Sequence, residues 1–581
     1  NEATISYALD SSRNLFSYIS SPQRLGLRYT YQGRFLVNEQ TEEVNSALVA
    51  HTYYRNLQLS TGRVDYDYVI DKFNQAGWVV YSYDNDENLS QVGEISLDYY
   101  TPDGLLDTAK SGLSQDQVTK FIYNSYGDVL TQTTITGTTQ VHKMTLTYDS
   151  VGREKTKKED IVGVTTPDYD YSYDSLGRLT EVKDGATTIS QYTYDNNGNR
   201  HTSIDSGGSV SYTYDNQDRL TNAGIYTYTY SQNGERQSKT NTLTSEVTYY
   251  TYDSFGNLIS VQLPNGDVVT YEIDALNRRV GKKKNGILQS RYIYMDALRI
   301  AAELDGSMQL KRRFGYATKS NIPDYYVEAG VKYRIISDQV GSPRLVFNID
   351  NASIVAAMNH SEFGKVVANT NTSLNLPFGF AGGLWDEDTG LLRFGARDYD
   401  PETGRWTSKD PIGFLGGDTN LYAYVGGNPM SYIDPSGLES EVVIWEPTGW
   451  GSSSFGHISA SINGTAYSFG PGGMWTGSSG AYNLANSFRN GVGIKLSLTP
   501  DQEKKFEQSL KGDQGKYNSV TNNCGDAVER GLSAAGVNAG NSLLPVSIGT
   551  SLLGVPQFSG TSFYTPINGS NDFFRRAPWA R

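Results

Sequence analysis

Two aspartates lie in closely similar tetrapeptides late in the chain, and together they could carry out acid–base chemistry. Asp410 opens "DPIG" and Asp434 opens "DPSG". Two carboxyl groups held close together do not both ionise readily, so one keeps a proton and the other acts as a base. Such a pair can activate water against a peptide carbonyl. The Pro and Gly of each tetrapeptide fix the local backbone, and the alternative interpretation is that both are simple β-turns.

A cysteine and a histidine could form a second reactive pair after residue 438. Residues 439–581 contain Cys524, the one cysteine of the chain, and a single histidine, His457. A thiol at a helix N-terminus gains thiolate character from unpaired N–H groups and the helix dipole. A nearby imidazole then serves as the base. The alternatives are that Cys524 is a small buried apolar residue and that His457 has only a structural role.

A hairpin is expected to carry His457. Apolar and polar residues alternate on either side of Asn463-Gly464, which predicts two strands joined by a type I′ turn. In this register Ser459 faces Ser468, and His457 lies on the polar face diagonal to Ser468. Ser468 is therefore the residue of the hairpin that could orient the imidazole, because no second His, Asp or Asn is expected on that face.

A helix is expected to carry Cys524. Asn522 and Asn523 stand immediately before it as capping residues. The apolar residues that follow recur at helical spacing. They are Ala527, Val528, Leu532 and Ala535. The sequence therefore predicts a helix that begins at or beside Cys524, with Asp526 and Glu529 on its solvated face.

A short pattern repeats through the part of the chain that must position these residues. It consists of an aromatic residue, any residue, Tyr, Asp, a polar turn with Gly, and then Arg or Asn. Copies include "LTYDSVGRE", "YSYDSLGRL", "YTYDNNGNR", "YTYDNQDRL", "YTYDSFGNL" and the degenerate "YEIDALNRR"; "YTYTYSQNGE" supplies a further copy. Most steps between the aspartates are 20–25 residues, a period typical of repeat architectures.

Each copy predicts a strand followed by a hairpin turn. Alternation in Tyr192-Thr193-Tyr194 places both rings on one face of a sheet and the threonine on the other. A single copy cannot bury its aromatic face, so neighbouring copies must extend one continuous sheet. We assign these tyrosines and aspartates a structural role and no catalytic one.

Composition and charge restrict the function. The chain has 581 residues, including 60 Gly, 43 Tyr and one Cys, so it has no disulfide framework. Residues 439–581 hold ten acidic and ten basic residues, which places the whole net charge of −14 in residues 1–438. An acidic body argues against nucleic acid as the main partner. The apolar runs are too short for a membrane span, and "NEATISYALD" starts in mid-pattern, as expected of a processed or truncated chain.

The repeats resemble the YD repeats of the Rhs (rearrangement hot spot) proteins, which are related to teneurins and to the C components of insecticidal toxin complexes. The stretch from Pro377 to Leu438 resembles the end of the Rhs core. This resemblance implies a hollow β-cocoon built from the repeats and a core end that closes it. It also implies a variable toxin after the final D-P-x-G-L, which the cocoon encloses. The expected divisions are a shell over 1–376, a core end over 377–438 and a toxin domain over 439–581.

The Rhs resemblance also implies a role for the two aspartates. Asp410 and Asp434 would form an aspartyl autoprotease that cleaves between Leu438 and Glu439. Some relatives carry an arginine close to the first aspartate, and here the nearby basic residues are Lys409 and Arg405. The family further implies synthesis in a bacterial cytoplasm and a cognate immunity protein. It also implies delivery into a target cell by a secretion apparatus such as type VI, which would bind a missing N-terminal region.

The order of strand-His and helix-Cys resembles circularly permuted papain-like hydrolases of the NlpC/P60 and lecithin–retinol-acyltransferase-like group. The shared motifs are a Gly-His before an alternating strand and an Asn-Cys that opens a helix. The resemblance implies a cysteine hydrolase or acyltransferase of the amidase, deamidase or lipase type, with Cys524 as nucleophile and His457 as base. A peptidoglycan peptide, a glutamine of a host protein and a lipid ester all remain open as substrates.

We therefore expect a mainly β protein, a large YD-repeat cocoon followed by a small α+β papain-like domain, that needs no cofactor and no metal. A metal-dependent nuclease would need several ligands, and residues 439–581 contain one histidine. The remaining alternatives are a non-catalytic membrane-active or binding module after residue 438, and a teneurin-like adhesive or structural role for the whole chain.

Overall fold

The computed structural model describes residues 105–437 with three short gaps (125–127, 297 and 412–418), most strands before residue 105, and separate elements after residue 440. In these residues the protein is mainly β, with a large antiparallel sheet, which confirms that part of the prediction. None of the helices in the described residues is long and apolar enough to cross a membrane. The described part of the chain also contains no group of three or more His, Cys, Asp or Glu that could hold a metal ion.

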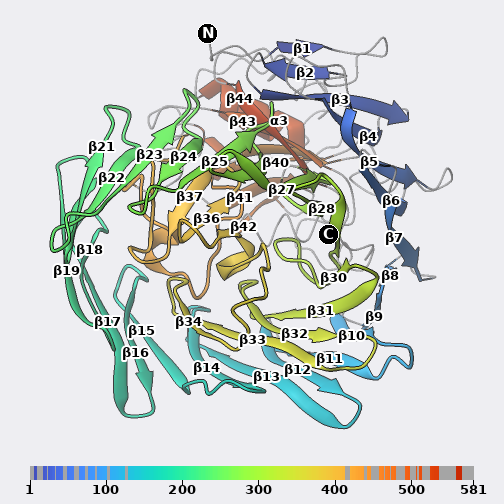
Figure 1. The fold of residues 1–581 in the computed structure, drawn as a ribbon, viewed down its shortest axis with the longest axis horizontal. Helices are drawn as coiled ribbons and strands as arrows, with labels where there is room; N and C mark the ends of the chain where they lie inside the picture. The colour runs from blue at the N-terminus through green and yellow to red at the C-terminus, as the bar shows by residue number, and fades with distance from the viewer. Residues whose placement is uncertain are drawn as a thin grey trace.

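A sheet of 34 strands forms the shell (Figure 1), and each strand pairs antiparallel with the next one along the chain. The first seventeen strands are β1 (Ser6–Ala8), β2 (Tyr18–Ser21), β3 (Arg24–Gln32), β4 (Phe35–Glu42), β5 (Val49–Leu57), β6 (Val64–Asp71), β7 (Ala76–Tyr83), β8 (Leu89–Val92), β9 (Ile95–Tyr99), β10 (Leu106–Ser111), β11 (Gln117–Tyr123), β12 (Val129–Thr136), β13 (Thr139–Tyr148), β14 (Glu154–Ile161), β15 (Tyr169–Tyr173), β16 (Leu179–Asp184) and β17 (Thr187–Tyr194).

The second half of the shell continues this order. Its strands are β18 (Arg200–Asp205), β19 (Gly208–Tyr214), β20 (Leu220–Ala223), β21 (Tyr226–Tyr230), β22 (Arg236–Asn241), β23 (Val247–Tyr252), β24 (Leu258–Gln262), β25 (Val268–Ile273), β26 (Arg279–Lys284), β27 (Ile287–Tyr294), β28 (Ile300–Asp305), β29 (Leu310–Gly315), β30 (Tyr325–Glu328), β31 (Val331–Ser337), β32 (Pro343–Asn348), β33 (Ile354–His360) and β34 (Val366–Asn369).

The repeat motif forms the strand and turn that were predicted. In β17 the Tyr192 side chain is buried and Thr193 is exposed, so the aromatic residues face inward. The following turn is closed by a hydrogen bond from the Gly198 main-chain N–H to the Asp195 carbonyl at 3.2 Å. Gly198 has a φ of 80°, which glycine adopts without strain. In the further copy, Ser231 replaces the aspartate and accepts the corresponding bond from the N–H of residue 234 at 3.2 Å.

The shell curls until strands far apart in sequence lie side by side. Figure 1 shows β31–β33 beside β10–β14. Here Arg344 Nη2 donates to Glu159 Oε2 at 2.6 Å, and Gln132 Nε2 donates to the Ser337 carbonyl at 3.0 Å. We call this line of contact between β10–β15 and β31–β33 the shell seam. It joins an early and a late part of the chain through buried polar side chains, which must be paired because burial removes their water.

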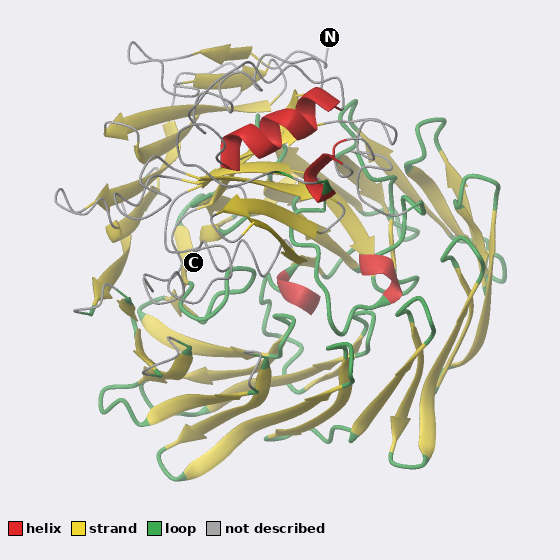
Figure 2. Ribbon diagram, turned by 180° about the vertical axis from the view of Figure 1, so that it is seen from behind, coloured by secondary structure: helices red, strands yellow, loops and turns green. Residues whose placement is uncertain are grey.

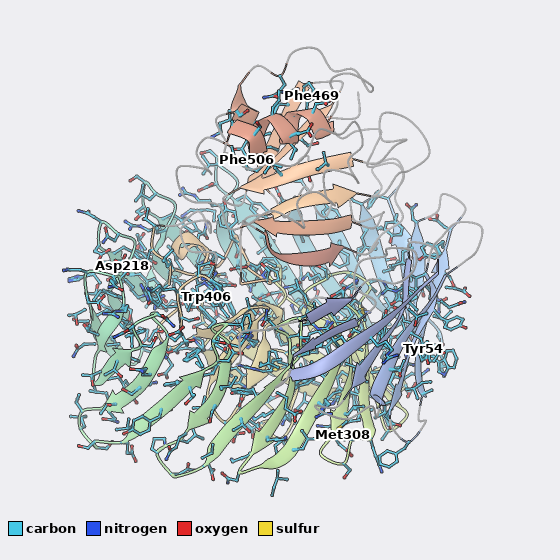
Figure 3. All side chains as sticks on the ribbon, turned by 90° about the horizontal axis from the view of Figure 1, so that it is seen from above. Tyr54, Asp218, Met308, Trp406, Phe469 and Phe506 are labelled. Atoms are coloured by element: carbon cyan, nitrogen blue, oxygen red, sulfur yellow. The ribbon has the colours of Figure 1, made fainter. Side chains whose placement is uncertain are left out.

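The core end, residues 377–437, forms a small sheet inside the curve of the shell. Its elements are η1 (Phe380–Gly382), β35 (Leu384–Asp386), β36 (Leu391–Phe394), β37 (Arg397–Asp400), β38 (Arg405–Trp406) and η3 (Val425–Gly427). Trp406, labelled in Figure 3, is 1% exposed and packs edge-on against Tyr399, Phe394 and Tyr424. This aromatic cluster gives the core end its own apolar interior.

Charged side chains fix the core end to the shell. Arg236 Nη1 of β22 lies 2.7 Å from Asp400 Oδ2, and Arg279 Nη2 of β26 lies 2.8 Å from Asp398 Oδ1. All four side chains are buried. Buried pairs of this kind specify one docking position, because displacing either partner leaves an uncompensated charge.

A separate sheet, with six strands in the described residues, follows the core end. It runs in the order β42 (Gly473–Ser478), β41 (Thr465–Gly470), β40 (His457–Ile462), β39 (Glu441–Trp445), β43 (Gly491–Leu496), β44 (Phe558–Tyr564). The helix α3 (Cys524–Ala534), drawn in red in Figure 2, packs against β40 and β41. Figure 3 shows this sheet and helix standing over one side of the shell. Enclosure of residues 439–581 by the shell stays a prediction.

Candidate self-cleavage site

The structure brings Asp410 and Asp434 to a single nitrogen atom. Asp410 follows β38, and Asp434 is one of the last described residues of the core end. Both side chains are buried. Arg397 Nη2, on β37, lies 2.7 Å from Asp410 Oδ2 and 3.1 Å from Asp434 Oδ2. The two tetrapeptides therefore place their carboxyl groups on either side of one guanidinium group.

Arg397 also binds the chain that leads to the expected cleavage site. Its Nε donates to the Gly437 carbonyl oxygen at 2.8 Å, and its guanidinium carbon lies 4.2 Å from the centre of the Trp406 ring. Stacking on the indole restricts the plane of the guanidinium group. One side chain thus fixes both carboxylates and the residue before Leu438. Leu438 and Glu439 lie outside the described residues.

A tight crossing of two backbone segments holds Asp434 in place. The Ala396 main-chain N–H donates to the Ser436 carbonyl at 2.9 Å, and the Ser436 hydroxyl lies 3.2 Å from Asp434 Oδ1. A Cβ atom on Gly395 would lie 2.2 Å from the Ser436 carbonyl oxygen. Gly395 is therefore required at the crossing. On the other side of the pair, the Asp410 main-chain N–H donates to the Leu421 carbonyl at 3.0 Å.

The basic partner of the aspartates is a residue that the sequence did not single out. Arg405 is committed elsewhere, because its Nη1 donates to Asn199 Oδ1 at 2.8 Å and its Nη2 to the Asp218 carbonyl at 2.7 Å. Arg397 takes the position beside both carboxylates. Two buried carboxyl groups need a buried cation, and "FGARDYD" holds an arginine between two aromatic residues, which is a signal that could have identified Arg397.

Arg397 changes the electrostatics expected of the pair. Proximity alone favours one shared proton between two carboxyl groups. A guanidinium group within hydrogen-bonding distance of both offsets part of their negative charge. Together the three groups carry one net negative charge when both aspartates are ionised.

Tyr424 is a second residue of the site that the sequence did not identify. Its ring packs against Tyr399, with 4.6 Å between ring centres, and its side chain is 1% exposed. Burial raises the pKa of Tyr424, and the neighbouring Asp434 carboxylate raises it further. Tyr424 therefore stays a neutral hydroxyl beside one member of the pair.

The strand and helix of the second predicted site meet as expected, although the side chains of His457 and Cys524 lie outside the described residues. His457 is the first residue of β40 and Cys524 the first residue of α3. The hairpin has the predicted register, with Ile462 opposite Thr465. Because α3 packs against β40, the backbones that carry the two residues belong to one packed unit.

Both faces of β40 are buried where the structure describes its side chains. Ile458, Ser459 and Ala460 are all buried, and so is Ser468 of β41. β40 is an inner strand of the sheet, and α3 packs against it. In α3 the predicted stripe is confirmed where the structure describes it. Ala527, Val528 and Leu532 are buried.

Comparisons with known proteins agree with the sheet architecture. A match to the Teneurin YD-shell family spans residues 2–430. The chain belongs to this YD-shell family. The resemblance to the Rhs and YD-repeat proteins, predicted from the repeats, is thereby confirmed.

The similar proteins fall into two groups. Teneurin-3 of Danio rerio is 30% identical over 322 residues, which cover 52% of this chain and 11% of that protein. The tRNA3(Ser)-specific nuclease WapA of Bacillus spizizenii is 26% identical over 348 residues, which cover 55% of this chain and 14% of that protein. The YD-shell chain thus spans only a small part of each relative.

A solved structure shares the fold. The crystal structure of TcdB2-TccC3-Cdc42 superimposes with a TM-score of 0.50 at 16% identity, over 75% of this chain and 24% of that one. At this identity the likeness concerns the fold alone.

Proposed function

We propose that this YD-shell protein is an Rhs-type effector whose Asp410 and Asp434 cleave the chain between Leu438 and Glu439. The observation that carries the proposal is the contact of both buried carboxylates with Arg397 Nη2, while Arg397 Nε binds the Gly437 carbonyl. The two aspartates are thereby linked through Arg397 to Gly437, which is one residue before Leu438.

The reaction is a hydrolysis that needs water and no cofactor. The ionised aspartate takes a proton from water, and the resulting hydroxide adds to the Leu438 carbonyl carbon. The other carboxyl group donates its proton to the Glu439 nitrogen as the peptide bond breaks. The products are a carboxylate at Leu438 and an amine at Glu439. Arg397 keeps both carboxyl groups in position and offsets their charge throughout.

The released segment, residues 439–581, would be the toxin, and the shell would hold it until delivery. The similarity to WapA, a nuclease by its name, supports a toxin-bearing role. The proposal includes synthesis in a bacterial cytoplasm, delivery into a target cell, and an immunity protein for the producer.

For the toxin itself we propose a cysteine hydrolase with Cys524 as nucleophile and His457 as base. Its support is the helix that begins at Cys524 and packs against the strand that begins at His457. Main-chain N–H groups of the first turn of α3 would bind the oxyanion of an acyl intermediate. The second candidate is a teneurin-like adhesive role without cleavage, which the similarity to Teneurin-3 favours.

Self-cleavage is tested by purifying the chain and measuring the masses of its parts. We expect two fragments that separate at Leu438–Glu439, and one intact chain for Asp434→Asn. Asp274→Asn is the matched control and should still give two fragments, because Asp274 is also buried and paired with an arginine but lies in a repeat turn of the shell. A folded wild-type chain that stays intact would disprove the self-cleavage and leave the adhesive role.

The toxin proposal has its own test. An electrophilic thiol probe should label residues 439–581 in the wild type and not in Cys524→Ser. Expression in a sensitive cell should inhibit growth, and Cys524→Ala or His457→Ala should abolish the inhibition. Undiminished growth inhibition by both variants would show that the segment is not a cysteine hydrolase.

A further inference from the structure

The segment that carries Asp434 rests on the shell seam just before it reaches the self-cleavage site. The Met430 carbonyl oxygen lies 3.5 Å from Gln339 Nε2, and the Ser431 hydroxyl lies 3.4 Å from the Glu154 main-chain nitrogen. Gln339 Nε2 also donates to Glu154 Oε2 at 2.6 Å. Glu154 and Gln339 therefore bind each other and the two residues that precede Asp434 by three and four positions.

Apolar contacts anchor the same segment. The Met430 side chain is 7% exposed and packs into a cluster of inward-facing residues from β15–β17. These are Tyr169, Tyr171, Leu179, Val182 and Tyr192, with Phe363. The Ser431 hydroxyl also hydrogen-bonds the Tyr173 side chain. The position of the segment is thus set by the inner face of the shell.

The two polar anchors come from opposite sides of the seam. Glu154 is the first residue of β14, in the early part of the shell, whereas Gln339 lies between β31 and β32, in the late part. Asp410 and Arg397, in contrast, belong to the core end. Asp434 therefore meets Arg397 in a geometry that depends on both sides of the seam being in place.

We propose that Glu154 and Gln339 are positioning residues that make self-cleavage conditional on closure of the shell seam. The inference rests on the proposed autoprotease and adds its regulation. The chain would cut itself after the shell has folded around the core end, so an incomplete shell would not release residues 439–581.

Glu154 is suited to this role because its carboxyl group is poorly compensated. Its Oε1 is buried and has no hydrogen-bond partner among the described residues. Burial raises the pKa of Glu154 to about 8, against the opposing effect of the Lys157 ammonium. The other charged groups that face it are Asp338 across the seam and Glu159 on its own strand. The neutral carboxyl group accepts the Gln339 bond without placing a further charge in the seam.

The test compares two buried glutamines that both bridge the seam. Gln339→Ala removes the bond to Glu154 and the contact with the Met430 carbonyl, whereas Gln132→Ala removes a bond to the Ser337 carbonyl instead. We expect Gln339→Ala to slow self-cleavage of the full chain by about tenfold or more, since small displacements of a catalytic group have effects of this size. Gln132→Ala should cleave at the wild-type rate with a similar loss of thermal stability.

The conservative variant separates positioning from general stability. Glu154→Gln keeps an acceptor for Gln339, so it should cleave at neutral pH like the wild type. Above about pH 8 the wild type should slow relative to Glu154→Gln, because only the wild type gains a buried charge at this position.

Two outcomes would overturn the inference while leaving the autoprotease intact. One is equal cleavage of Gln339→Ala and the wild type, and the other is equal slowing of Gln339→Ala and Gln132→Ala. An intact wild-type chain, or cleavage that persists in Asp434→Asn, would overturn the proposed autoprotease and this inference with it.

Discussion

At the residue scale, the repeat motif forms hydrogen bonds that link each repeat unit to the next. Asp174 Oδ1 accepts the main-chain N–H of Arg178 at 3.0 Å, and Asp174 Oδ2 accepts Arg178 Nε at 2.6 Å. Arg178 Nη1 donates to the Asp195 carbonyl of the next unit at 3.0 Å, and its guanidinium group lies over the Tyr194 ring at 4.8 Å. The motif therefore recurs because each arginine needs the following copy as its partner.

Tyr424 and Tyr399 allow a prediction about single hydroxyl groups. The Tyr424 hydroxyl makes only a poorly aligned contact with the Asp434 backbone, whereas Tyr399 donates to the Phe363 carbonyl at 2.9 Å. Tyr399→Phe leaves that carbonyl unpaired and should cost about 1–2 kcal/mol of stability. Tyr424→Phe should cost less than this, because it removes a buried hydroxyl group that is poorly satisfied.

The measurement is the thermal unfolding midpoint of the two variants beside the wild type. A larger loss for Tyr424→Phe than for Tyr399→Phe would show that the Tyr424 hydroxyl makes a stabilising bond. Measuring self-cleavage of the same samples would show whether this hydroxyl, which lies beside Asp434, also affects the reaction.

At the scale of elements, the core end is held by buried ion pairs to strands of the shell. Arg236 of β22 reaches Asp400 of β37, and Arg279 of β26 reaches Asp398 of the same strand. β37 also carries Arg397, so the strand whose arginine binds Asp410 and Asp434 is itself fixed to the shell at two points. The position of the site therefore depends on how β37 is held against the shell.

The Arg236–Asp400 pair predicts an asymmetric effect of mutation. Asp400→Ala leaves a buried guanidinium group without its carboxylate and should cost about 3–5 kcal/mol. The double variant Asp400→Ala/Arg236→Met removes both charges and should recover most of that loss. Denaturant unfolding of the three proteins measures the difference. Equal destabilisation of the single and double variants would show that the pair contributes by packing alone.

At the scale of the whole molecule, the shell seam gives the fold a dependence on pH. Burial raises the pKa of Glu154 from 4.5 to about 8, so the folded form binds this proton more tightly than the unfolded form. The contribution of Glu154 to stability is therefore full below pH 4.5 and declines as the pH rises towards 8. Over this range the loss is on the order of a few kcal/mol.

Glu154→Gln isolates this contribution because glutamine does not titrate. The variant should be more stable than the wild type at pH 8, and the advantage should shrink as the pH falls towards 5. Thermal unfolding in buffers across this range measures the difference. A difference between the two proteins that does not change with pH would contradict the prediction.

The sequence by itself determined the local structure. Four local features depend on residues that are close together in the sequence. They are the alternation in Tyr192-Thr193-Tyr194, the turn at Asp195, the hairpin register around Asn463-Gly464 and the helix that begins at Cys524. The periodicity of apolar residues and the residue preferences of turns act over short distances, so these elements can be predicted before the fold is known.

Only the tertiary structure decided which side chains meet. It selected Arg397 over Lys409 and Arg405 as the partner of both aspartates, and it placed Glu154 and Gln339 under the segment that leads to Asp434. These contacts join residues far apart in the chain, and they depend on how far each strand is twisted and how tightly the shell curls. No short stretch of sequence encodes that curvature, because it accumulates over all the strands of the sheet.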